Sequence, residues 1–371
     1  MAVYRIFPEK DAFIFSESPK ANAGLDEILE VGGYQDISGI GETSRILIQF
    51  DQKEIQDVFD SHIKTASFSA SLGVYLADAY QIPYNTSLYI YPLYSQTGWD
   101  NGTGKYGDIP VNSSGVSWNY QKTGETSPWL IAGYPTGITG SYVNGKEGGG
   151  TWYYEVSGSS VEKVQQNSIK STYDISINVT DIVKLWNEET IPNSGFLLKI
   201  GKEVEFNTSA SVRLKYFGAD TNTVYPPYLD IKWNDVVYNT GSLSIISSDN
   251  FKLTLINNKG KYTDVGKQRF RLSAKPKYPV RTFTTSSIYI QNYALPSSSY
   301  WGLRDENTEE MVIDFDDNFT KISCDSKGNY FDVYMNGLQP ERYYRILVKS
   351  VVDGTTTVVD NGNIFKIVRN G

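Results

Sequence analysis

The sequence has one cysteine, Cys324, and one histidine, His62, among its 371 residues. A single cysteine cannot form an internal disulfide, so the fold has to be stable without cross-links, as in proteins assembled in a reducing cytosol. A single histidine excludes a metal site built from several histidines, and no motif places a nucleophile and an orienting acid beside it. We therefore expect His62 to be a packed or solvated helix residue and Cys324 to be a small buried side chain.

Long apolar runs are missing as well. No stretch approaches the roughly 18 residues of a membrane span, and charged residues interrupt the N-terminus before a secretory signal could form. We expect no membrane insertion and no cleavable signal peptide. Basic residues are fewer than acidic ones: the chain has 34 Lys and Arg and 42 Asp and Glu, for a net charge of −8. A negative chain repels phosphate backbones, which argues against nucleic acid as a partner.

What the sequence has in abundance is the composition of strands and turns. Hydrophobic residues make up 40% of the chain, enough for a proper core, and aromatic residues reach 14%, with 28 Tyr and 16 Phe. Glycine is frequent, with 32 residues. This mixture is typical of short strands joined by many turns, and it excludes a helical bundle, a coiled coil or a disordered chain.

Alternation of apolar and polar residues predicts half-buried strands over 44–50 and 173–179. Helix is scarce. Apolar spacing predicts short helices over 54–62 and 180–186, and Thr180 is expected to cap the first amides of the second one.

A domain boundary is predicted near residues 235–243. A strand over 225–233, preceded by two prolines, looks like the end of a first domain at 1–235. After a Gly- and Ser-bearing link the pattern restarts, and seven short strands in a second domain at 243–371 suit an immunoglobulin-like sandwich. These strands are predicted at Phe251–Ile256, Phe270–Ala274, Ser287–Gln291, Met311–Phe315, Tyr330–Tyr334, Tyr343–Val351 and Ile364–Val368.

Several short motifs in the first domain occur in an order and spacing that resemble β-sandwich modules named after a DNRLRE sequence motif. These modules in turn resemble a group of carbohydrate-binding modules. The resemblance implies an all-β, jelly-roll-like β-sandwich. Between about 120 and 172 the chain is longer than those modules and richer in glycine and aromatic residues. The matching segments are Asp11–Phe13, Gly24–Leu25, Leu29–Gly32, Ser44–Asp51, Trp99–Gly104, Ser117–Asn119, Asn178–Val183, Trp186, Gly195–Phe196 and Tyr225–Leu229.

The whole chain, second domain included, looks like virion structural proteins of contractile-tailed phages, especially marine ones. This resemblance implies a particle component assembled in the host cytoplasm, which agrees with the single cysteine. It also implies a homo-oligomer, because particle components repeat by symmetry. The segments that carry it are Tyr293–Tyr300, Ile322–Phe331, Gly337–Lys349 and Asp360–Val368.

The aromatic residues of 98–154 are the most prominent candidate for binding. Trp99 and Trp118 match the module motifs, so we assign them to core or loop packing. Trp129, Tyr134, Tyr142 and Trp152 lie in the divergent segment and are our candidate surface residues, for protein contact or for glycan contact, although core packing is the simplest alternative. Flat aromatic faces suit both sugars and protein interfaces.

Charged residues give weaker signals. Asp26, Glu27, Glu30 and Asp36 could supply oxygen ligands to calcium, but they lack the spacing of a calcium loop, and a solvated loop is the preferred interpretation. Arg45, just before a buried strand, is expected to pair with a carboxylate. No active-site pattern is present, so we expect no enzymatic activity, no cofactor and no metal.

Taken together, these observations predict a non-enzymatic structural component of a tailed-phage virion. Its place is the tail, baseplate or fibre region as first choice and the head or neck as second, with docking on other virion proteins and a role in host attachment. The alternative is a carbohydrate-binding module that recognises host surface glycans. A polysaccharide-degrading enzyme built on two spaced carboxylates is the third hypothesis.

Overall fold

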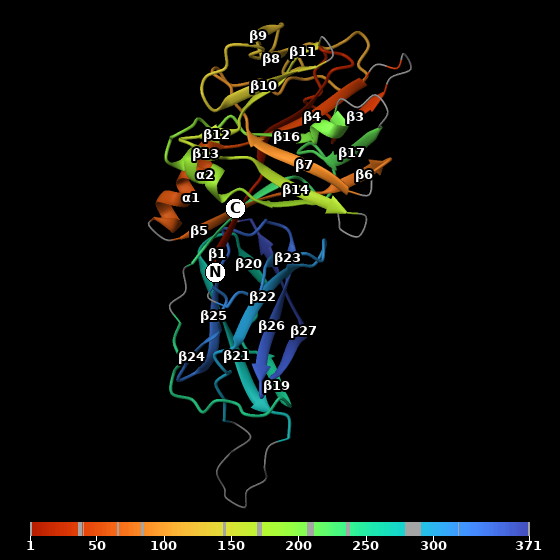
Figure 1. Ribbon diagram of the computed structural model, residues 1–371. Coiled ribbons are helices and arrows are strands. Elements are labelled where there is room, and N and C mark those ends of the chain that lie inside the picture. The colour runs from red at the N-terminus through yellow and green to blue at the C-terminus, as the bar shows by residue number, and fades with distance from the viewer. Residues whose placement is uncertain are drawn as a thin grey trace, which may run out of the picture. The chain divides into compact units, whose positions relative to one another are not determined.

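The protein, seen here in a computed structural model, is built almost wholly from β-strands (Figure 1). The structure describes residues 2–35, 39, 41–64, 67–82, 85–143, 146–168, 173–205, 211–234, 238–278, 291–317 and 319–369. Two compact units divide the chain. The N-terminal unit comprises Ile6–Lys64 and Ser69–Asp230, and the C-terminal unit comprises Ile231–Gly371 together with Met1–Arg5 and Thr65–Phe68. Sequence patterns gave no indication that the first five residues group with the C-terminal part.

The larger sheet of the N-terminal unit is antiparallel and has eight strands. Its order is β14-β7-β16-β4-β3-β17-β6, and β2 pairs with β4 beside this path. Such a curled sheet buries its inner face, and β4 is buried along nearly its whole length. The strands are β2 (Pro8–Phe15), β3 (Ile28–Gln35), β4 (Gly41–Phe50), β6 (Leu76–Tyr80), β7 (Asn85–Pro92), β14 (Lys163–Ser168), β16 (Phe196–Ile200) and β17 (Val212–Phe217).

A second, four-stranded sheet has the order β1-β18-β5-β15. Together with the larger sheet it gives the sandwich expected from the module resemblance, so the all-β prediction is confirmed. β1, β5 and β18 each contain residues of both units. The strands are β1 (Ala2–Ile6), β5 (Phe68–Val74), β15 (Ile175–Asn178) and β18 (Tyr228–Trp233).

Three short helical segments lie between strands. α1 (Gln52–Val58) begins after Asp51, whose carboxylate accepts the Lys53 amide at 2.8 Å, and a π-helical turn, η1 (Phe59–Ile63), continues it. α2 (Thr180–Asn187) has no side-chain cap, so the cap predicted for Thr180 is wrong. The Thr180 hydroxyl instead accepts the amide of Ala70 in β5 at 2.9 Å. α3 (Lys202–Glu205) is a single turn.

The segment that diverges from the module pattern forms three small hairpins joined by loops. They are β8 (Tyr120–Lys122) with β9 (Thr126–Pro128), β10 (Ile138–Val143) with β11 (Lys146–Tyr153), and β12 (Glu155–Val156) with β13 (Ser159–Ser160). The sequence patterns did not indicate these strands.

The C-terminal unit is a sandwich of a four-stranded sheet, β19-β21-β25-β24, and a five-stranded sheet, β20-β27-β26-β22-β23. All pairs are antiparallel except β20 with β27. The strands are β19 (Phe251–Leu255), β20 (Lys261–Thr263), β21 (Lys267–Pro276), β22 (Ser299–Asp305), β23 (Met311–Ile313), β24 (Ser323–Asp325), β25 (Gly328–Tyr334), β26 (Tyr343–Val352) and β27 (Thr355–Val368).

Alternation fixes which face of each strand enters this core. Along β21, Phe270, Leu272 and Ala274 are buried, while the odd-numbered neighbours face outward. Phe270 lies 5.6 Å from the ring of Phe331 and 5.3 Å from that of Phe365, measured between centroids. Such aromatic contacts add to the free energy of burial.

The predicted strands of this unit agree with the structure where alternation is visible. Sequence analysis missed β22, which is buried on both faces and so shows no period of two. It also missed the short strands β20 and β24. The strand predicted at Ser287–Gln291 lies outside the described residues, apart from Gln291, which is in no strand.

The packing around Phe270 generates a first prediction. Phe270→Ala should destabilise the C-terminal unit by about 3–5 kcal/mol, because it leaves a cavity among rings that cannot close over it. Val358→Ala, at an exposed position, should change stability by less than about 0.5 kcal/mol. Urea unfolding followed by tryptophan fluorescence and circular dichroism measures both. Equal effects of the two substitutions would contradict this account of the core.

Candidate functional site

Two of the predicted surface tryptophans are in fact core residues of the N-terminal unit. The side chains of Trp129 and Trp152 are 2% and 6% exposed. They belong to one hydrophobic cluster with Trp99, Trp118 and Leu197. The surface placement predicted for Trp129 and Trp152 is therefore wrong, because the hairpins fold their aromatic side chains down onto the large sheet instead of displaying them.

Hydrogen bonds fix these rings in place. The indole N–H of Trp129 donates to the backbone oxygen of Ser117 at 3.0 Å, and that of Trp99 donates to Ser194 at 2.9 Å. The ring of Trp152 lies 5.6 Å from the ring of Tyr91. Buried indoles with a polar partner and ring neighbours have no free face to offer a sugar.

The other two candidate residues, Tyr134 and Tyr142, do not form an exposed aromatic patch in place of the buried tryptophans. Tyr134 is half-buried, and burial raises the pKa of its phenol. Tyr142 lies in β10, where its backbone pairs with Glu147, and its side chain lies outside the described residues. The structure thus brings Trp129 and Trp152 together in the core and does not assemble the four residues into one exposed patch.

The most unusual polar group of this unit is the guanidinium of Arg45, on β4, which is fully buried. Its Nε donates to Glu205 Oε1 at 2.7 Å, so the predicted carboxylate partner is present. The guanidinium also lies over the rings of Trp118 and Trp152, 5.0 and 5.2 Å from their centroids. A second nitrogen donates to the backbone oxygen of Gly149.

Lys199 completes this buried cluster. Its ammonium lies 2.7 Å from the second carboxylate oxygen of Glu205. Burial lowers the pKa of Lys199, although Glu205 opposes that shift. The cluster joins β4, α3, β11 and β16, so its role is that of a structural cross-link. Sequence analysis missed Glu205 and Lys199, because nothing in their local sequence marks them as partners of a residue 160 positions away.

A close approach explains one glycine of this region. Gly149 has φ +80°, and a Cβ at this position would lie 2.6 Å from the Trp118 ring and 2.8 Å from Nη1 of Arg45. Residues with a side chain rarely adopt this backbone conformation. The glycine run in the hairpin therefore lets its backbone reach the guanidinium.

Other groups singled out in the sequence have ordinary surroundings. Cys324 is buried, and burial raises the pKa of its thiol, while partial burial lowers the pKa of His62. Glu27 pairs with Lys105 at 2.8 Å, and Glu30 lies 3.8 Å from Arg213, whereas Asp36 lies outside the described residues. Within the described ranges, no group of His, Cys, Asp or Glu residues is arranged to hold a metal ion. Over the same ranges, no helix has the length and hydrophobicity to cross a membrane.

Asp11 is a buried acid that the sequence did not mark. It lies on β2, is 1% exposed, and accepts the amide of Ala219 at 2.6 Å. Burial raises its pKa to about 7; the Ala219 amide opposes this shift and the nearby Asp220 adds to it. Asp11 therefore exchanges its proton near neutral pH.

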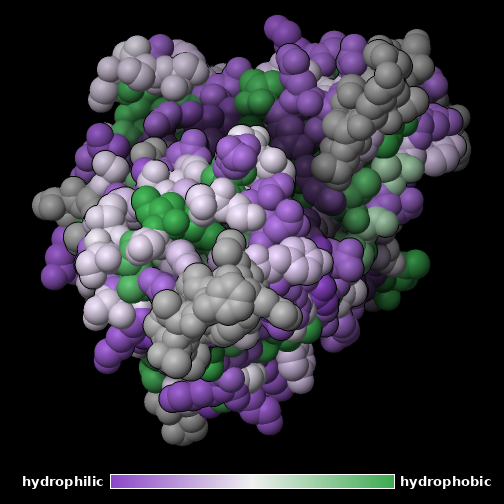
Figure 2. Space-filling view, turned by 90° about the horizontal axis from the view of Figure 1, so that it is seen from below, coloured by the Kyte–Doolittle hydropathy of each residue, from purple (hydrophilic) through white to green (hydrophobic). Residues whose placement is uncertain are grey.

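On the face seen in Figure 2, exposed apolar residues do not gather into one large patch. Hydrophobic residues there form small separate patches in a mainly hydrophilic surface. Scattered apolar residues of this kind are normal for folded proteins. We therefore turn to a surface of polar and aromatic residues.

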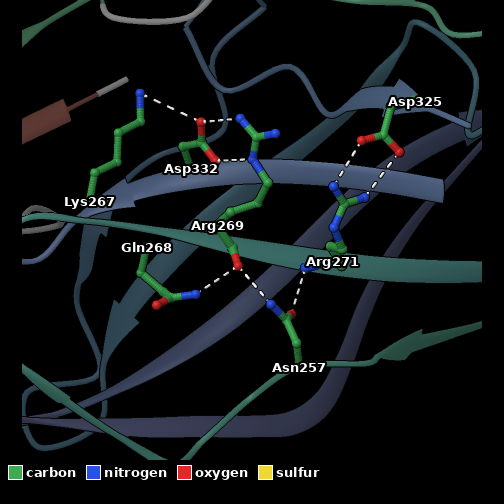
Figure 3. A network of polar contacts seen from close by, with 7 residues as sticks. All are labelled: Asn257, Lys267, Gln268, Arg269, Arg271, Asp325 and Asp332. Carbon is green, nitrogen blue, oxygen red and sulfur yellow. Dashed lines mark hydrogen bonds and ion pairs between the residues drawn. The ribbon is translucent and has the colours of Figure 1, made fainter. Parts of the chain in front are cut away.

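The outer face of the four-stranded sheet carries such a surface (Figure 3). Arg269 makes two hydrogen bonds to Asp332, at 2.7 and 2.9 Å, and Arg271 makes two to Asp325, at 3.0 and 2.8 Å. Hydrogen bonds from Arg271 hold the pKa of Asp325 below its ordinary value. We call this surface the ladder face; it consists of Lys267, Arg269 and Arg271 on β21, Tyr330, Asp332 and Tyr334 on β25, and Asp325 on β24.

Tyrosine rings support the cations of the ladder face. The guanidinium of Arg269 lies 4.1 Å from the centroid of Tyr330, and the ammonium of Lys267 lies 5.1 Å from that of Tyr334. The Arg269 side chain is still 46% exposed. Arginine and tyrosine are enriched where proteins bind one another, and side chains already held in place lose less entropy on binding. The ladder face can therefore dock a protein surface, and it has no group suited to bond chemistry.

Comparison with known proteins adds little. No family model and no curated protein matches the sequence. Among solved structures, a DUF4785 family protein from Legionella pneumophila is similar to this chain at 10% identity and a TM-score of 0.19. The match covers 97% of this chain, which spans 65% of the length of that protein. A likeness this weak supports no conclusion about function.

The buried cluster generates a second prediction. Arg45→Ala should destabilise the N-terminal unit by about 3–5 kcal/mol, because Glu205 stays buried with one cation fewer and the hairpin loses its link to the sheet. Removing the exposed pair of Lys53 and Asp57 by Lys53→Ala should cost less than about 0.5 kcal/mol. Chemical denaturation of both variants tests this, and similar losses would contradict a cross-linking role for Arg45.

Asp11 generates a third prediction, for pH dependence. An aspartate in the unfolded chain titrates near its ordinary pKa, so between about pH 4 and pH 7 the folded form keeps a proton that the unfolded form releases. The stabilising effect of this proton is complete below about pH 4 and is lost as the pH rises through 7, by up to about 4 kcal/mol. Asp11→Asn should remove this loss and be more stable than wild type at pH 8. Unfolding free energies at pH 5 and pH 8 measure the difference, and parallel pH profiles would contradict the assignment.

Proposed function

We propose that this chain is a non-enzymatic structural component of a tailed-phage virion that acts by docking on other virion proteins. The observation that carries this proposal is the ladder face, an exposed sheet surface whose Arg and Tyr side chains are held in place before any partner arrives. Sequence resemblance to virion proteins of contractile-tailed phages supports it. The tail, baseplate or fibre region is the favoured place, with the head or neck second.

The two sandwiches suit such a role in physical terms. Each unit has its own packed hydrophobic cluster, so each can present side chains on a stiff support. A component of a symmetric particle is present in several copies, which makes a homo-oligomer part of the proposal. Assembly would take place in the host cytoplasm, which suits a chain with one buried, unpaired cysteine.

Recognition of a surface glycan has less support than protein docking. Its main candidates, Trp129 and Trp152, are buried. A polysaccharide-degrading activity has no observation in its favour, since sequence alone could not pair two carboxylates and the structure links one buried acid, Glu205, to two cations. Protein docking therefore remains our proposal.

The docking proposal generates a fourth prediction. Antibody against the purified chain, coupled to gold, should label intact particles in the electron microscope, at the tail tip or fibres if the favoured placement is right. Label on the head or neck would support the second placement. The absence of label, with the epitopes shown to be accessible, would overturn the virion role.

The ladder face can be tested on its own. Arg269→Glu combined with Arg271→Glu should reduce co-sedimentation of the chain with the virion proteins that bind the wild type about tenfold or more, because each substitution replaces a cation of the ladder face with a negative charge. Lys259→Glu combined with Lys261→Glu makes the same charge change at exposed positions outside the ladder face. Equal loss in both double variants would point to net charge alone.

A further inference from the structure

The four-stranded sheet of the C-terminal unit ends in an open edge. β19 pairs with β21 on one side and with no strand on the other among the described residues. The Ile256 amide donates to Arg271, and the Lys277 amide donates to Asn250, so even-numbered residues of this strand face β21. In an antiparallel pair the intervening residues point their backbone groups the other way. The N–H groups of Leu253 and Leu255 are therefore directed outward.

A groove of about 430 Å³ runs along this edge. The half-buried Phe251 and Leu255 and the buried Leu253 lie along one side, and Val359, Asn361 and Asn363 of β27 lie along the other. Its one bridging hydrogen bond comes from a side chain: Asn361 Nδ2 donates to the backbone oxygen of Leu253 at 2.7 Å. That amide thus occupies the acceptor which a neighbouring strand would use.

The charge beside the groove is positive and unbalanced. Lys252 and Lys275 stand directly opposite each other across the β19–β21 pair, an arrangement of like charges that is unfavourable. Lys277 lines the groove two residues further on. Within the part of the chain that the structure describes, none of these three lysines pairs with a carboxylate. Arg269 and Arg271 of the same sheet differ from them, since each pairs with a carboxylate.

In the adjoining part of the sheet, a side chain hydrogen-bonds the backbone groups that a neighbouring strand would otherwise pair with. β19 ends at Leu255, and beyond it the Asn257 side chain accepts the amide of Arg271 and donates to the oxygen of Arg269, both at 2.8 Å (Figure 3). This side chain takes the place of a strand on β21. Among the described residues, the outward backbone groups of Leu253 and Leu255 have no comparable cover apart from the contact with Asn361.

We propose that the β19 edge binds an extended acidic segment of a partner protein, which adds to the sheet as a further strand. The backbone of the segment would pair with Leu253 and Leu255, its alternate apolar side chains would enter the groove, and its carboxylates would face Lys252, Lys275 and Lys277. This is the strand-addition mode of peptide recognition, in which the backbone provides affinity and alternate side chains provide specificity. The inference rests on the proposed function, since it names the chemistry of one docking partner.

The test uses a fluorescent peptide of about nine residues, the length of a long strand, in which Asp and Val alternate. Fluorescence anisotropy should show binding to the full chain. A peptide of alternating Lys and Val should not bind, and a peptide with the same Asp and Val content in two blocks should bind at least about tenfold more weakly, because only alternation matches the two faces of a strand. Equal binding of the alternating and block acidic peptides would overturn strand addition.

Variants of the chain locate the site. Lys252→Glu combined with Lys277→Glu should weaken binding about tenfold or more, whereas the control Lys261→Glu combined with Lys327→Glu should not. Asn361→Ala should bind as well as wild type or better, since it frees the oxygen of Leu253. Hydrogen exchange at the amides of Leu253 and Leu255 should slow when the peptide is added, and unchanged exchange would overturn the proposal even if the peptide binds.

Self-association provides the remaining decisive result. If sedimentation shows that the chain forms dimers which Lys252→Glu strengthens or weakens and which the acidic peptide does not dissociate, the edge belongs to a second copy and the proposal is overturned. Failure of the gold-labelling experiment would remove the virion role while leaving peptide binding measurable. Failure of peptide binding alone would remove the edge site and leave the ladder face as the docking surface.

Discussion

The buried guanidinium of Arg45 is the contact on which the N-terminal unit depends. It gathers a carboxylate, two indole rings and a backbone oxygen from segments far apart in the chain. A cation with no access to water is tolerated only when its charge and most of its donors find partners, and two of the three Arg45 nitrogens, Nε and Nη1, do so here. Each of those segments therefore has to arrive in register. The same contact accounts for the glycine run of the hairpin, for the burial of Trp118 and Trp152, and for the position of α3. Trp152, which the sequence suggested as a surface residue, instead packs against this cation.

The extent of what could be predicted follows from the range of each interaction. Strands with one wet face, such as β21 and β25, show their alternation in the sequence, and the all-β class follows from them. β22 is buried on both faces, so its sequence shows no alternation and the strand was not predicted. The partner of Arg45 was predicted only as a type of residue, because Glu205 is identified by folding and by nothing nearby in the chain. Trp129 and Trp152 were misplaced for the same reason: composition shows that a segment is aromatic, but the fold decides which way its rings point.

The C-terminal unit presents two kinds of surface on one sheet. At one end, carboxylates from β24 and β25 neutralise the arginines of β21 and hold them over a tyrosine ring. At the other end, lysines crowd together beside an edge with unused backbone groups. Interactions within the sheet satisfy the first surface. Among the described residues, the second has no carboxylate paired with its lysines, and Asn361 supplies a single hydrogen bond to its outward backbone groups. A sheet of this kind offers a rigid contact area and, separately, a place where another chain can extend it.

The lysines beside β19 have a consequence for the protein in solution. An open strand edge is a template for pairing with another copy of itself, and lysine is a common means of preventing that. Two β19 edges that approach each other bring like charges together, so at low ionic strength the copies stay apart. Salt shortens the range of this repulsion, to about 3 Å at 1 M, but leaves backbone hydrogen bonding intact. Concentrated salt should therefore promote self-association through the β19 edge. Buffers of low ionic strength should keep the copies of this chain separate.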